Sequence, residues 1–171
     1  STRQLTSLLG GVIVVTAILW SLSVPTLLGL NLYIGQYIYA LLALATLVVF
    51  LRKPMLPGRP GLSRVLDGGI ATVGVFAMLW IVINFGQYLD DANYRDFDAS
   101  GVAVALIVMA VLLEGVRRTA GLAFALIVAA ALLIAFFADA LPAPFTGRPF
   151  RLDSFAYKMA FLDGNILGSP L

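Results

Sequence analysis

The stretch that decides the fold is GVAVALIVMAVLLEGVRRTAGLAFALIVAAALLIAFFA, residues 101–138. Two long apolar runs flank one group of charged residues, Glu114, Arg117 and Arg118. An isolated charge in the hydrocarbon core of a bilayer costs several kcal/mol. We therefore expect these three side chains to lie near a membrane surface or to pair with one another.

The composition predicts an all-α integral membrane protein. Of the 171 residues, 61% are hydrophobic and 12% are charged, whereas a soluble domain has about 45–50% apolar and about 25% charged residues. The net charge is +2, and the basic residues stand at helix ends rather than in one patch, so nucleic-acid binding is not expected.

No enzymatic function is expected. The chain has no cysteine and no histidine, which excludes disulfides, thiolate chemistry and the usual zinc sites. It also has no GxSxG, HExxH or P-loop motif. We therefore predict no catalytic residues, no substrate-binding residues, no metal site and no cofactor in this chain.

Five segments are long and apolar enough to cross a membrane, which takes about 20 residues. Pro25 is expected to kink or end the first of them. Short connections predict antiparallel neighbours. The five segments are residues 5–30, 33–51, 65–88, 100–116 and 119–140.

A short amphipathic helix is expected at the membrane interface over residues 151–161. Its predicted apolar face consists of Leu152, Phe155, Ala156, Met159 and Ala160.

Basic residues in the connections predict the orientation. Arg52, Lys53, Arg59 and Arg64 separate the second and third segments, and such a basic connection lies in the cytoplasm. The acidic stretch 90–98 then lies outside. Because Arg117 and Arg118 fall inside, the N-terminus is expected to be cytoplasmic.

Glu114 precedes Arg117 and Arg118 by three and four residues, which allows all three to meet on one helical face. They can form a simple helix-end pair, with arginines that reach toward the interface, or a structural latch at the corner between the fourth and fifth helices. A substrate site is disfavoured, because transporter sites lie near the middle of the bilayer.

Small residues predict close helix packing, although such residues are also common in membrane helices generally. They are Gly101 and Ala105 on the fourth helix and Gly121, Ala125 and Ala129 on the fifth. No carboxylate lies at the centre of a span, so this chain alone is not expected to carry a substrate.

Residues 112–122, LLEGVRRTAGL, resemble the LEATRRTVG motif of the fused permease in TRAP transporters (tripartite ATP-independent periplasmic transporters) of the TAXI class. Residues 147–171 end in GNILGSPL, which is similar to the family's GIFGIPL. Residues 36–54 and RVLDGG at 64–69 also fit. Gly115 replaces the family's usual Ala, and residues 165–167 replace Gly-Ile-Phe.

The resemblance implies a membrane scaffold in a bacterial or archaeal cytoplasmic membrane. Residues 1–118 would form a small-permease-like four-helix scaffold, and residues 119–171 a connecting helix and interfacial segment that lead to an absent transport region. The implied partners are that large transport region and a periplasmic binding protein that delivers an organic acid. Sodium or proton coupling would belong to the transport region.

Two other functions stay open on the residues alone. The chain could be the small membrane subunit of another binding-protein-dependent system, such as a tripartite tricarboxylate transporter. It could also be a stand-alone structural membrane protein. The sequence that follows Leu171 in the native gene product would distinguish the fused permease from both.

Overall fold

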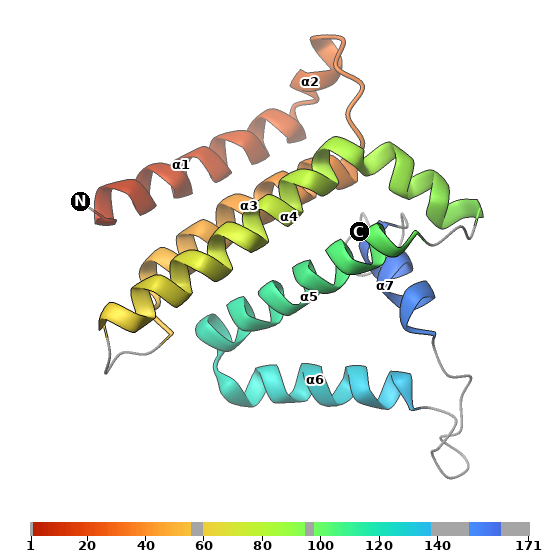
Figure 1. Ribbon diagram of the computed structural model, residues 1–171. Coiled ribbons are helices and arrows are strands. Elements are labelled where there is room, and N and C mark those ends of the chain that lie inside the picture. Colours follow the sequence, from red (N-terminus) through yellow and green to blue (C-terminus); the bar gives the residue numbers. More distant parts are fainter. Residues whose placement is uncertain (1, 56–59, 95–97, 138–150, 162–171) are drawn as a thin grey trace. The chain divides into compact units, whose positions relative to one another are not determined.

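The computed structural model describes residues 2–55, 60–94, 98–137 and 151–161 (Figure 1). All regular structure within these ranges is helical, and four helices are long and apolar enough to cross a membrane: α1, α3, α4 and α5. The prediction of an all-helical chain is confirmed within these ranges, and the four helices agree with a protein that crosses a membrane several times. The elements are α1 (Thr2–Ser21), α2 (Val24–Leu27), α3 (Ile34–Arg52), α4 (Pro60–Tyr94), α5 (Ala99–Ala120), α6 (Leu122–Phe136) and α7 (Leu152–Phe161).

Several helix ends differ from the predicted ones. Helix α4 continues to Tyr94, so Asp90 and Asp91 belong to a helix and not to a connecting loop. Helix α5 continues to Ala120, four residues beyond its predicted end. Helix α6 has 15 residues, fewer than the about 20 that a crossing needs, and residues 138–140 lie outside the described ranges. A fifth crossing therefore stays a prediction.

The predicted first helix over residues 5–30 is wrong at its far end, because two elements occupy this range. Helix α1 ends at Ser21, and Ser23 adopts a left-handed conformation with φ 56° and ψ 25°. A non-glycine residue rarely adopts this conformation inside a helix. Pro25 lies in the first turn of α2, where its missing N–H leaves no helical hydrogen bond unmade.

The chain divides into two compact units, an N-terminal unit over Ser1–Gly86 and a C-terminal unit over Gln87–Leu171. The division falls within α4. It describes packing, whereas the predicted boundary between residues 118 and 119 concerns function and stays a prediction.

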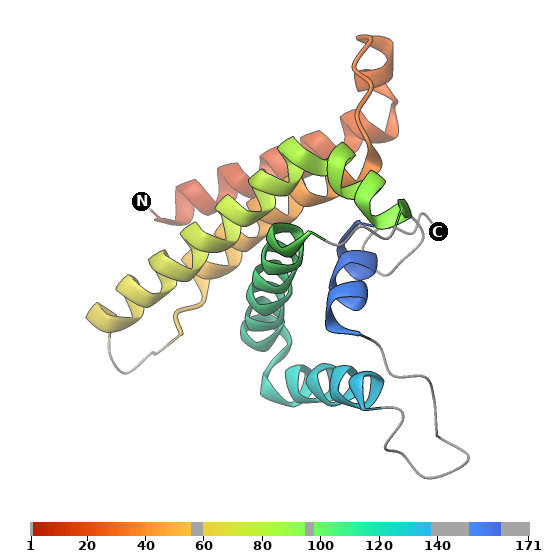
Figure 2. The same ribbon diagram turned by 45° about the vertical axis from the view of Figure 1, so that its right-hand side comes forward.

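Helix α3 is the centre of the N-terminal unit. It packs against α1, where Trp20 stacks on Tyr37 with a centroid distance of 4.3 Å, and it runs beside α4 in both views (Figures 1 and 2). The Gln36 side chain joins two elements, because its Nε2 donates to the carbonyl oxygen of Val82 at 2.8 Å while its Oε1 accepts from the N–H of Tyr33 at 3.0 Å.

Gly35 permits the close approach of α3 and α4. A Cβ atom at this position would overlap the ring of Phe85, which is only 2% exposed. The Phe85 ring also contacts Tyr39, with a centroid distance of 6.5 Å. The absence of a side chain on α3 therefore creates the space that an aromatic ring of α4 fills.

In the C-terminal unit, α5 and α6 form a hairpin and α7 packs on α5. Gly121 separates the two helices of the hairpin with φ 96° and ψ 168°, a backbone conformation that is essentially restricted to glycine. The turn is therefore made by a single residue.

We predict that Gly35→Ala destabilises the N-terminal unit by about 1–3 kcal/mol, because an added methyl group overpacks the contact with Phe85. Unfolding of the purified protein by SDS in mixed micelles, followed by circular dichroism, measures this loss. The matched control is Gly86→Ala, where the nearest atom to the added Cβ is Tyr33 Cε2 at 3.7 Å, an ordinary contact. Equal stability of the two variants would contradict the packing argument.

Candidate functional site

The charged corner consists of Glu114, Arg117 and Arg118 in the last two turns of α5. Arg117 binds the carboxylate with two atoms, since Nε lies 2.7 Å from Oε2 and Nη2 lies 2.7 Å from Oε1. Arg118 Nε donates to the same Oε1 at 2.8 Å. The spacing of three and four residues thus brings both guanidinium groups to one carboxylate, as the sequence predicts.

Exposure differs across the charged corner. The Arg118 side chain is 2% exposed, Glu114 is 18% exposed and Arg117 is 34% exposed. Two-atom arginine–carboxylate contacts are among the stronger hydrogen-bonded pairs, and removal of one partner from a buried pair is costly. Arg118 therefore depends on Glu114 more than Arg117 does.

The location of the charged corner has a simple physical basis. Cations in the last turn of a helix interact favourably with the carbonyl ends of the helix. Gly121 ends α5 directly after these residues, so the charged corner lies about one turn before the turn of the hairpin. This arrangement is suited to hold a helix end in place, and a role as a latch remains a proposal.

The basic residues that predict orientation surround the connection between α3 and α4. Arg52 ends α3 and Lys53 is its C-cap, Arg64 lies in the second turn of α4, and Arg59 lies outside the described residues. All of the described ones are exposed.

Asp67 of α4 ties this connection to the helix, a role that the sequence did not identify. Its carboxylate accepts from the N–H of Met55 at 3.2 and 3.3 Å and from Ser63 Oγ at 2.7 Å. Asp67 is 7% exposed and Ser63 is 1% exposed. The Ser-x-x-x-Asp spacing was the available signal, but the partner Met55 lies in a loop whose path the sequence does not reveal.

The predicted helix-packing residues have different roles. Gly101 and Ala105 are buried on α5, and a Cβ on Gly101 would overlap the ring of Tyr157 of α7. On α6, Ala125 is buried and Ala129 is half-buried. Gly121 differs from the prediction, because it lies between the helices and a Cβ there would meet open space.

Helix α7 is anchored by aromatic rings that the predicted apolar face did not include. Tyr88 of α4 stacks on Phe161 with a centroid distance of 4.7 Å, and Tyr157 packs edge-on against both rings. Leu152, a predicted member of that face, is instead 50% exposed. The buried face therefore contains Phe155, Ala156, Tyr157, Ala160 and Phe161.

No family model, curated protein or solved structure matches the chain. Within the described ranges, no group of three or more Asp, Glu, His or Cys side chains gathers in a way that could hold a metal ion.

We predict that Glu114→Gln lowers the free energy of unfolding by about 1–3 kcal/mol, because the buried Arg118 loses its charged acceptor. Unfolding in mixed micelles measures this change. The control is Asp153→Asn, which weakens the exposed pair between Arg151 Nη2 and Asp153 Oδ2 at 2.9 Å. An exposed pair contributes about 0–1 kcal/mol, so a loss in the control as large as in Glu114→Gln would contradict the assignment.

A second prediction concerns alkaline pH. Burial, together with the negative charges of Asp91, Asp98 and the ionised hydroxyl of Tyr88, raises the pKa of Tyr157 from 10.0 to about 12. The unfolded chain releases this proton at lower pH than the folded chain does, so stability falls as the pH rises from 10 toward 12. The variant Tyr157→Phe has no hydroxyl to ionise, so its stability should not show this fall between pH 10 and 12.

The measurement is the SDS concentration at half-unfolding, between neutral pH and the alkaline range. The wild-type protein and Tyr157→Phe should differ in this SDS concentration by a constant amount near neutral pH. The difference should then become smaller above the ordinary tyrosine pKa of about 10. A difference that stays constant throughout would show that the hydroxyl titrates as it does in water.

Proposed function

We propose that this chain forms the membrane scaffold, or stator, of a TRAP-type secondary transporter that imports an organic acid delivered by a periplasmic binding protein. The observation that carries the proposal is the position of charge in the four candidate spans. Every charged residue of α1, α3, α4 and α5 lies within the terminal two or three turns of its helix. A substrate or ion pathway usually needs a polar group or a broken helix near the middle of the bilayer.

The charged corner supports the same proposal. Its carboxylate is already occupied by two guanidinium groups, so it is suited to a fixed structural contact rather than to reversible binding. Close packing at Gly35 and Gly101 favours a rigid helical set. A rigid part that does not bind cargo fits a stator against which another part moves.

The resemblance of EGVRRTAG at residues 114–121 and of GNILGSPL near the end of the chain to the TAXI class supplies the family in this proposal. The partners are then a large transport region, fused or separate, a periplasmic binding protein and the lipid bilayer. Sodium or proton coupling belongs to the transport region. The proposed membrane is the bacterial or archaeal cytoplasmic membrane, with a cytoplasmic N-terminus.

The test uses the full permease with its transport region in proteoliposomes, together with the purified binding protein. We expect Glu114→Ala to reduce both the assembled fraction and the uptake of labelled organic acid, because the charged corner no longer holds its helix end. The cargo affinity of the binding protein should not change. Gly115→Ala is the control, since a Cβ there meets open space.

Three results would contradict parts of this proposal. Uptake by the present chain alone would show that it carries cargo itself. Normal assembly and normal uptake in Glu114→Ala would remove the charged corner from the mechanism, and failure to co-purify with any large membrane chain would favour a stand-alone structural protein.

A further inference from the structure

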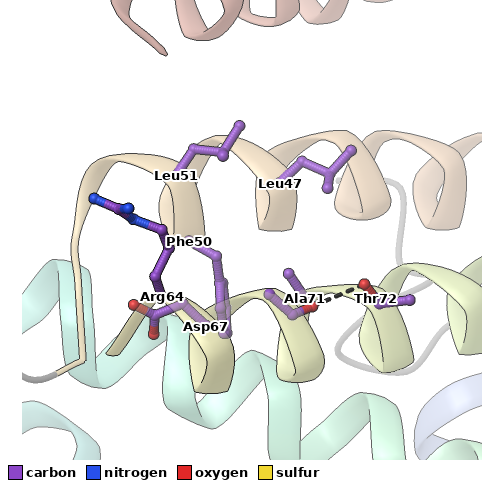
Figure 3. A pocket seen from close by; sticks show the side chains of 8 residues that line it. Leu47, Phe50, Leu51, Arg64, Asp67, Ala71 and Thr72 are labelled. Atoms are coloured by element: carbon purple, nitrogen blue, oxygen red, sulfur yellow. Dashed lines mark hydrogen bonds between the residues drawn. The ribbon is translucent and has the colours of Figure 1, made fainter. Parts of the chain in front are cut away.

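A groove of about 410 Å³ lies between the ends of α3 and α4 that flank their basic connection. Figure 3 shows the side chains that line it, with Leu47 and Leu51 on α3 and Arg64 and Asp67 on α4. Its volume is within the range of about 300–1,000 Å³ that small-molecule sites have. The lining residues are Leu47, Phe50, Leu51, Arg64, Asp67, Gly68, Ala71 and Thr72.

The wall of the groove is apolar over most of its length. Leu47 and Leu51 supply one side, and Gly68 leaves the other side open, because a Cβ there would meet no atom within 4 Å. The one hydroxyl on this wall, Thr72 Oγ1, donates to the carbonyl oxygen of Gly68 at 2.7 Å and so does not offer its proton to the groove. A hydrocarbon chain fits this surface.

The charged end of the groove favours an anion. Within the described part of the chain, the Arg64 guanidinium has no hydrogen-bond or ion-pair partner. The carboxylate beside it, Asp67, keeps its negative charge but accepts its hydrogen bonds from the N–H of Met55 and the hydroxyl of Ser63, and it forms no ion pair with Arg64. Arg52 and Lys53 at the end of α3 add positive charge nearby. The groove therefore presents an available cation next to an apolar wall.

We propose that this groove binds an anionic phospholipid of the surrounding bilayer, with its phosphate at Arg64 and one acyl chain along Leu47, Leu51 and Gly68. The bilayer itself supplies this ligand, since α3 and α4 are both candidate spans. Basic sites between membrane helices bind anionic headgroups, and each arginine or lysine near the surface contributes about 1 kcal/mol. The proposal is independent of the transport role.

The experiment measures lipid retained by the full chain after exchange in mixed micelles that contain equal amounts of phosphatidylglycerol and phosphatidylcholine. Extracted lipid is quantified by mass spectrometry. We expect the wild-type protein to retain phosphatidylglycerol in about fivefold excess over phosphatidylcholine. Arg64→Gln should abolish this excess, whereas Arg64→Lys should keep part of it.

Two matched controls separate the groove from general effects of charge and volume. Gly68→Leu should expel both lipids, because its side chain fills the groove, while Gly69→Leu places the same side chain on the same helix outside the lining. Arg52→Gln removes one charge at the same end of the helix pair without altering the lining. Gly69→Leu should behave as the wild-type protein does, and Arg52→Gln should lower the excess of phosphatidylglycerol less than Arg64→Gln does, because Arg52 does not line the groove.

Four results would overturn the proposal. These are equal retention of both lipids by the wild-type protein, equal effects of Arg52→Gln and Arg64→Gln, equal effects of the two leucine variants, and displacement of the lipid by excess glycerol 3-phosphate. The last would assign the site to a soluble anion. Circular dichroism of every variant checks that its helix content is unchanged.

Discussion

Hydrocarbon tolerates charge only where the charge reaches water or meets an opposite charge, and this constraint explains where the charged residues of this chain lie. Glu114 pairs with the arginines three and four residues later near the end of α5, which leaves the group with one net positive charge. Asp67 is satisfied by the loop N–H of Met55 and by Ser63. The interiors of the four candidate spans contain no charged residue, and the proposal of a scaffold rests on that observation.

Tight packing completes the arrangement, because helices in lipid gain little from burial of apolar surface and depend on close contact. Gly35 accepts the Phe85 ring in the N-terminal unit, and Gly101 accepts the Tyr157 ring in the C-terminal unit. In each case a residue without a side chain faces an aromatic ring from another helix. Each unit therefore contains one close contact of this kind between two of its own helices.

Much of the fold follows from local sequence. Both ends of helix α3 lie within one residue of the predicted ends. Helix α7 begins one residue after its own predicted start. The misplaced ends have physical reasons. Helix α4 continues through Asp90 and Asp91, because Tyr88 and Ala92, four residues apart on the same stretch, are buried. Helix α1 stops at Ser21, because Ser23 turns the backbone before Pro25 begins another short helix.

The sequence by itself determined the helical class, four of the five predicted spans and the charged corner, since pairing at three and four residues is a property of any single helix. Only the tertiary structure decided which residues meet across helices. The contacts of Gly35 with Phe85 and of Gly101 with Tyr157 join segments 50 and 56 residues apart. The hydrogen bonds from the N–H of Met55 to Asp67 and the groove beside Arg64 depend on how two helices and their loop come together. The periodicity of apolar residues in the sequence carries no information about that arrangement.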